Sequence, residues 1–136
     1  MRDVVEKALA VTLALVLGGN GLAMLFAGPW WYAAVPGVPA TGPYNPHFVK
    51  DIGAAYLVCA AALAAFAWRP ARARPALAAA TAFLVLHAAV HVADAIASPT
   101  CGQDLVRDLP GVFLPAFICL GLVLGAHASN LEVRHA

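Results

Sequence analysis

Prolines and short polar stretches divide this chain of 136 residues into four apolar runs. A helix needs about 20 apolar residues to cross the hydrocarbon core of a bilayer. The runs cover residues 4–27, 48–68, 76–97 and 111–129. Only 11% of the residues are charged, whereas soluble domains have about 25%. We therefore predict an all-α fold: a four-helix transmembrane bundle that forms one integral-membrane domain, residues 1–136.

The basic residues predict the orientation of this bundle. The connection between the second and third runs holds arginines at positions 69, 72 and 74, and Arg2 and Lys7 lie at the start of the first run. By the positive-inside rule, this connection and both termini are cytoplasmic. We expect a multi-pass protein of a bacterial inner membrane. A cleaved signal peptide is the alternative for the first run, but Asp3 and Glu6 are unusual in the charged region of a signal peptide.

The first connection, residues 28–46, then faces the outside. It is rich in proline and glycine, so we expect no helix there. Its residues Trp30, Trp31 and Tyr32 are typical of an aromatic belt at a membrane interface. We expect this connection to fold back over the outer end of the bundle, and the third connection, residues 98–110, to cover that end from the other side.

Three ionisable residues interrupt the third apolar run. His87, His91 and Asp94 are spaced by four and three residues, which places them within about 60° of one another around a helix. Polar groups at membrane depth are costly and usually face the interior of a bundle or a wet cavity. This stripe is therefore the leading candidate for a functional site.

A second polar group opens the second run. Asn45 is a predicted helix N-cap, and His47 and Asp51 lie four residues apart on one helical face. The connection between the second and third runs is short, so the two helices should be neighbours. Both polar groups would then lie at similar depth near the outer end, with Asn20 of the first run in support.

Imidazole and carboxylate groups are suitable ligands for Zn, Fe, Cu, Mn or Ni. We therefore predict a transition-metal site used in metal handling or in membrane redox chemistry, with Asn20 as a further cofactor-binding residue. The predicted metal ligands are His47, Asp51, His87, His91 and Asp94. The zinc-protease motif His-Glu-x-x-His is absent, and no catalytic residue is assigned.

Three other interpretations of the same residues stay open. The network is structural in the first, and the protein is then a non-catalytic accessory subunit. In the second, a His/Asp pair handles protons beside a quinone headgroup. The third is a haem held between His47 and either His87 or His91. The expected partners are the lipid bilayer and either a second copy of the chain or a membrane redox complex. No basic patch interleaved with aromatic residues points to nucleic acid.

Three sequence segments carry a family resemblance. The layout Asn20-Gly21, Pro29-Trp30 and Asn45-Pro-His-Phe-Val-Lys-Asp-Ile-Gly-Ala-Ala-Tyr56 resembles small four-helix bacterial membrane proteins of the DoxX-like type. The resemblance covers most of the chain and implies the bundle architecture. It also implies association with membrane quinone redox complexes. It assigns no role to His87, His91 or Asp94.

Overall fold

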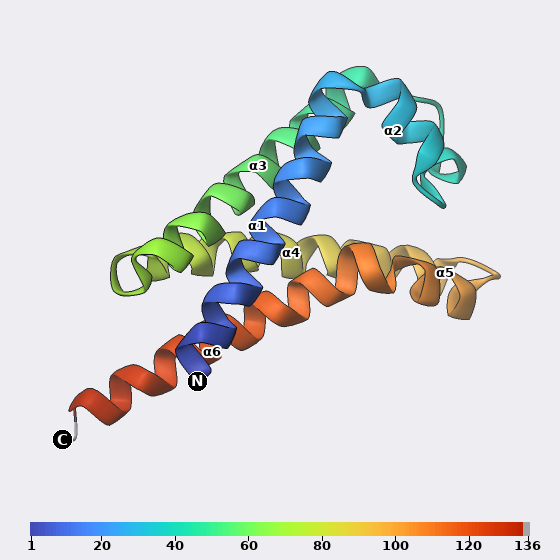
Figure 1. Ribbon diagram of the computed structural model, residues 1–136. Helices are drawn as coiled ribbons and strands as arrows, with labels where there is room; N and C mark the ends of the chain where they lie inside the picture. Colours follow the sequence, from blue (N-terminus) through green and yellow to red (C-terminus); the bar gives the residue numbers. More distant parts are fainter. Residues whose placement is uncertain (135–136) are drawn as a thin grey trace.

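The structure, a computed structural model, describes residues 1–134, except for the side chains of Arg2 and of residues 127–134. The described residues form helices and no strand (Figure 1). The elements in chain order are α1 (Arg2–Phe26), α2 (Gly28–Ala34), the 3-10 helix η1 (Val38–Thr41), α3 (Pro46–Trp68), α4 (Pro70–Ala97), α5 (Cys101–Asp108), the π-helix η2 (Leu109–Phe113) and α6 (Leu114–Arg134).

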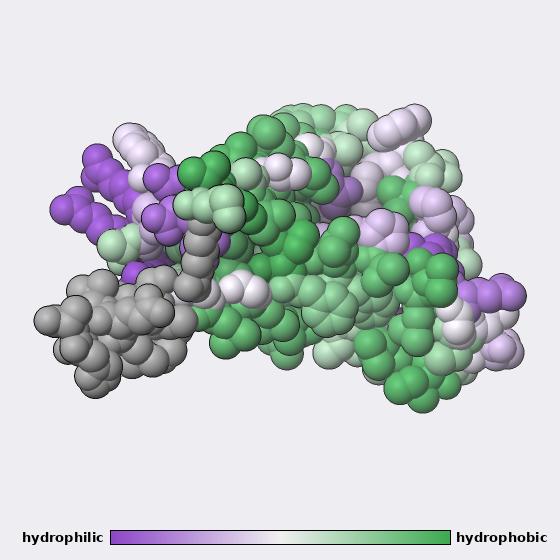
Figure 2. Space-filling view, turned by 60° about the horizontal axis from the view of Figure 1, so that its bottom comes forward, coloured by the Kyte–Doolittle hydropathy of each residue, from purple (hydrophilic) through white to green (hydrophobic). Residues whose placement is uncertain are grey.

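Four helical stretches among the described residues are long and apolar enough to cross a membrane. They are Asp3–Phe26, Pro46–Trp68, Pro70–Ala97 and Cys101–Ala126. Figure 2 shows a broad apolar band between two ends where hydrophilic residues gather. We call one of these the arginine end, after Arg69, Arg72 and Arg74, and the other the cap end, after α2, η1 and α5. This pattern indicates a multi-pass membrane protein that contacts the lipid bilayer.

The closest helix pair is α1 and α3, which cross at two glycines. A Cβ atom placed on Gly21 would lie 2.7 Å from the carbonyl oxygen of Gly53, and one placed on Gly53 would lie 2.8 Å from the Cβ atom of Met24. Only glycine allows so close an approach of the two backbones. Next along the bundle, α3 packs on α4 and α4 packs on α6, while α1 touches α6 only slightly. The predicted contact between the second and third spans is confirmed.

The core runs along the interior of the bundle. Its most deeply buried large side chains are Leu17, Leu63, Phe66 and Leu77. Alanine is frequent among the remaining buried residues, which lets the helices pack closely. Large apolar side chains such as Leu15 and Leu86 are exposed, as expected for surfaces that face lipid.

The two connections at the cap end are more helical than expected. The first contains α2, which has Pro29 in its first turn, a position where the fixed φ angle and missing N–H of proline favour a helix start. The third contains α5, which continues without a break through η2 into α6. Pro110 lies within η2, where the helix widens instead of ending. The expectation that the first connection holds no helix was therefore wrong.

The first residues of α3 and α4, the two middle membrane-length helices, can be compared with the predicted helix starts. Asn45 caps α3 as predicted, because its side-chain oxygen accepts hydrogen bonds from the backbone N–H groups of His47 and Phe48, both at 3.1 Å. By contrast, α4 begins at Pro70 rather than at Ala76, and Pro75 lies inside it. Proline at the first position costs nothing, since the N–H groups of the first turn have no intrahelical partner.

Candidate functional site

The central contact of the site joins α4 to α5. The Nδ1 atom of His91 lies 2.7 Å from the Oδ2 atom of Asp108, and the two side chains are 31% and 10% exposed. Asp108 ends α5, immediately before η2, so the π turn presents its carboxylate to α4. Hydrogen bonds of this length to an ionised carboxylate are among the stronger ones in proteins.

An arginine holds the Asp108 carboxylate in place from the other side. The Nε atom of Arg107 donates to Oδ1 of Asp108 at 2.8 Å, and its Nη1 donates to Oδ1 of Asp104 at 2.7 Å. The Thr100 hydroxyl donates to the other oxygen of Asp104 at 2.9 Å. Because Asp108 accepts from Arg107, it acts as an acceptor toward His91 as well. The hydrogen that His91 donates is then on Nδ1, and Nε2 is the ring nitrogen left for another partner.

A second histidine continues this arrangement toward the core. The ring centroids of His87 and His91 are 4.8 Å apart. The Nε2 atom of His87 shares a hydrogen bond of 3.1 Å with the hydroxyl of Tyr56, a buried residue of α3. The Phe83 ring stacks almost parallel to the His87 ring, with an interplanar angle of 9°. The result is a line of four protonatable side chains that runs from the cap end into the bundle, in the order Asp108, His91, His87 and Tyr56.

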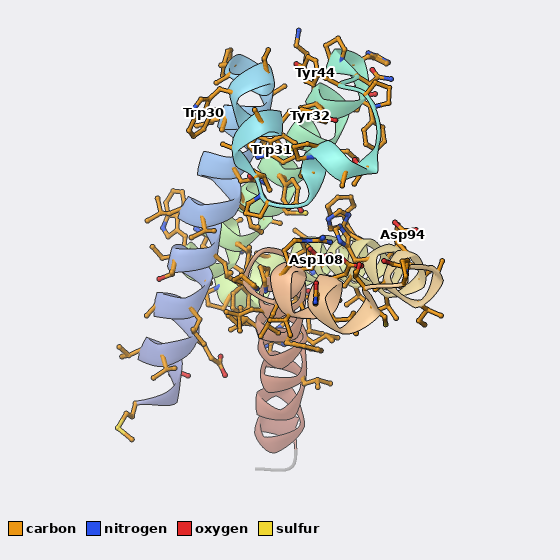
Figure 3. All side chains as sticks on the ribbon, turned by 90° about the vertical axis from the view of Figure 1, so that its right-hand side faces the viewer. Trp30, Trp31, Tyr32, Tyr44, Asp94 and Asp108 are labelled. Atoms are coloured by element: carbon orange, nitrogen blue, oxygen red, sulfur yellow. The ribbon has the colours of Figure 1, made fainter. Side chains whose placement is uncertain are left out.

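The first connection lies over the arginine of this cluster. Gly37 has a φ angle of 86°, and a Cβ atom there would lie 2.5 Å from the Nε atom of Arg107. The connection is fixed to α1 by a hydrogen bond of 2.7 Å from the indole Nε1 of Trp31 to Oδ1 of Asn20. Figure 3 shows Trp31 and Asp108 on the facing sides of these two parts of the cap end. The expectation that both connections cover this end is therefore met by a direct contact between them.

The predicted site residues divide into three groups. His87 and His91 lie together in the line just described. His47 and Asp51 form a separate pair at the start of α3, with 3.4 Å between Nε2 and Oδ2 and side chains that are 89% and 62% exposed. Asp94 is exposed on α4, apart from Asp108 (Figure 3).

Asn20 has a role that its sequence position did not indicate. Its side-chain oxygen accepts the Trp31 hydrogen bond, and its Nδ2 atom lies 3.7 Å from the sulfur of Met24. Its polar atoms are thus used to join α1 to α2. The assignment of Asn20 to a cofactor stays a prediction, and binding there would have to displace the indole of Trp31.

Four residues of the line and its cluster were not predicted as site residues: Tyr56, Asp104, Arg107 and Asp108. Tyr56 was read as part of an apolar helix, and Arg107 and Asp108 as part of a loop. A local signal exists for Arg107, which follows Asp104 by three residues, a spacing that gives ion pairs along a helix. No such signal exists for Tyr56, since its partner is 31 residues away in the sequence.

The described residues contain no group of three or more His, Cys, Asp or Glu side chains placed to hold a metal ion. His91 uses one ring nitrogen for Asp108, and His87 uses one for Tyr56. Each imidazole has one further nitrogen, but the predicted carboxylates Asp51 and Asp94 are exposed and not in contact with either. The metal site stays a prediction that this arrangement of side chains does not favour.

An apolar groove lies beside the His91–Asp108 pair. It has a volume of about 350 Å³ and is shared by α4, α5, η2 and α6. Its lining residues are Val92, Leu105, Val106, Leu109, Phe113 and Phe117. Val92 and Leu109 are the chain neighbours of His91 and Asp108, although neither polar side chain lines the groove.

No protein family, no curated protein and no solved structure matches this chain.

Proposed function

We propose that this protein is a component of membrane quinone redox chemistry. In this proposal the line from Asp108 to Tyr56 binds the polar headgroup and either gives protons to a quinone that a partner redox enzyme reduces by two electrons or takes them from a quinol that such a partner oxidises. The observation that carries the proposal is the pairing of His91 with Asp108, which leaves a basic nitrogen on a ring that a carboxylate holds in place. The resemblance to DoxX-like proteins supports the same class.

The adjoining groove supports a lipid-soluble ligand in particular. A quinone ring accepts hydrogen bonds through its carbonyl oxygens, the reduced quinol ring donates them through its hydroxyls, and both forms have an apolar tail that stays in the bilayer. The groove beside the His91–Asp108 pair is lined only by apolar side chains, and Leu109 and Phe117 are exposed toward the surrounding lipid. A tail in this groove would place the ring close to His91.

We infer the orientation of the protein in the membrane from the distribution of its arginines. The cap end faces the periplasm, and the arginine end and both termini face the cytoplasm of a bacterial inner membrane, because arginine collects on the cytoplasmic side. The line of protonatable groups would then exchange protons with the periplasm through the polar cluster of Asp104, Arg107 and Asp108.

A structural role is the second candidate, and one observation favours it. Asp104, Arg107, Asp108, His91 and His87 each have a hydrogen-bond partner in the bundle. Polar groups that are satisfied in this way hold helices together without any ligand. Such a protein would be a non-catalytic accessory subunit of a membrane complex.

Quinol titration separates the two candidates. The full-length protein in a nonionic detergent is titrated with a short-chain quinol, and quenching of tryptophan fluorescence reports binding. We expect saturable binding that weakens several-fold in His91→Gln, since one neutral hydrogen bond contributes about 0.5–1.5 kcal/mol. His47→Gln is the matched control at an exposed site and should bind as the parent does.

Three results would contradict the proposal. Absence of saturable quinol binding by the parent protein would leave the structural role. Near-stoichiometric Zn, Fe, Cu, Mn or Ni in the purified protein, lost in the His87→Ala, His91→Ala double variant, would establish the metal site instead. A Soret band lost in the same variant would establish haem.

A further inference from the structure

A second apolar groove lies at the other end of the molecule, between α1 and α3. It has a volume of about 350 Å³. Its lining residues are Val11, Ala14, Leu15, Ala64, Ala67 and Trp68. Three of the six are alanines, whose small side chains leave the hollow between the two helices. Leu15 and Trp68 are 72% and 78% exposed, so the groove opens on the surface that faces lipid.

The arginine end begins where this groove ends. The Arg69 guanidinium lies over the Trp68 ring, 5.0 Å from its centroid, in a cation–π contact. Arg72 follows one turn later and is exposed. A charged group that enters at Trp68 would therefore meet Arg69 first and Arg72 next to it.

The positive charge of this cluster is not neutralised by the described part of the chain. Neither Arg69 nor Arg72 forms an ion pair with a described carboxylate, and the first turn of α4 contains no acidic residue. The Nε atom of Arg74 is buried and has no hydrogen-bond partner among the described residues. The cluster is thus complementary to an anion.

We propose that this is a binding site for an anionic glycerophospholipid. One acyl chain lies in the α1–α3 groove, and the phosphate of the headgroup is bound by Arg69 and Arg72. The argument uses the continuity of an apolar groove and a positive cluster, because a phospholipid joins those two chemistries in one molecule. A second copy of this chain is disfavoured as the occupant, since it would bring the same arginines toward this cluster.

The test compares two lipids that share their acyl chains and differ in the headgroup, one anionic and the other zwitterionic. The full-length protein in nonionic detergent is mixed with phosphatidylglycerol or with phosphatidylcholine of identical acyl chains, and bound lipid is counted by native mass spectrometry. We expect phosphatidylglycerol to bind at least about tenfold more tightly, since one surface arginine near an anionic lipid contributes a factor of about five. Equal binding of the two lipids would overturn the proposal.

Variants locate the site. The double variant Arg69→Gln, Arg72→Gln should reduce phosphatidylglycerol binding to the level of phosphatidylcholine, and Arg69→Lys, Arg72→Lys should keep most of the preference. Lys50→Gln is the matched control, because it removes a basic residue from the cap end. Loss of the preference in Lys50→Gln, or its survival in the double glutamine variant, would contradict the assignment to this cluster.

A third set of measurements distinguishes binding of the whole lipid from binding of its phosphate group alone. Ala64→Leu adds a larger side chain at an exposed position of the groove, and should weaken the binding of both lipids several-fold. Inorganic phosphate offers the same charge without a chain, and we expect it to leave the thermal midpoint of the protein unchanged at concentrations where phosphatidylglycerol raises it. If phosphate alone raises the midpoint as far, the site binds an anion and not a lipid.

Discussion

His91 and Asp108 form the contact that defines the candidate site, with 2.7 Å between Nδ1 and Oδ2. The nearer carboxylate in the sequence is Asp94, which lies one helical turn from His91 on the same helix. The structure directs Asp94 outward and brings Asp108 to His91 from α5 instead. The pair therefore joins two separate helices, and it depends on the π turn that connects α5 to α6.

The two carboxylates should differ clearly in their effect on stability. Asp108→Asn removes the charge that both His91 and Arg107 use, and we expect the free energy of unfolding to fall by about 1–3 kcal/mol. Asp94→Asn changes an exposed residue and should cost less than about 0.5 kcal/mol. Denaturation of both variants in detergent micelles measures the difference. Equal effects would mean that the His91–Asp108 pair does not form.

The hydroxyl of Tyr56 should matter to His87. Tyr56→Phe removes this partner, and we expect a loss of about 1 kcal/mol in stability together with a change in the ¹⁵N chemical shifts of the His87 ring. Tyr44→Phe is the matched control, since its ring packs on Tyr32 and its hydroxyl forms no hydrogen bond among the described residues. An unchanged His87 spectrum in Tyr56→Phe would refute the contact.

The crossing of α1 and α3 should tolerate no side chain at its centre. Gly53→Ala places a Cβ atom 2.8 Å from that of Met24, so the helices must separate, at a cost of about 1–3 kcal/mol. Gly19→Ala adds the same methyl group to α1 where no atom lies within 4 Å. It should stabilise the protein by up to about 1 kcal/mol, because alanine favours a helix more than glycine does. Thermal midpoints in detergent would show these opposite signs.

Gly37 should be coupled to Arg107. Gly37→Ala imposes a left-handed conformation on alanine and also drives its Cβ atom into the guanidinium that binds Asp104 and Asp108. The left-handed backbone conformation of alanine alone lowers the free energy of unfolding by about 1–2 kcal/mol. We expect a larger loss in the parent than in an Arg107→Ala background, and this double-mutant cycle isolates the contact. Additive losses in the cycle would show that the first connection does not lie against α5.

Local features of the sequence determined the outline of this protein. Runs of about 20 apolar residues, separated by prolines, specify membrane-length helices, since the hydrocarbon core leaves backbone groups no other partners. The cap by Asn45 and the spacing of His87 and His91 on one face are equally local, because both depend on residues within one turn.

Tertiary structure decided which polar groups meet. The spacing of residues along one helix determines which of its side chains point in the same direction. It does not determine how the neighbouring helices are rotated or how deep they lie, and those helices supply the partners. Tyr56 reaches His87 from α3, and Asp108 reaches His91 from α5, while His47 and Asp51 remain an exposed pair of their own. The sequence therefore predicted two of the four residues in the line, and the packing of the helices selected the other two.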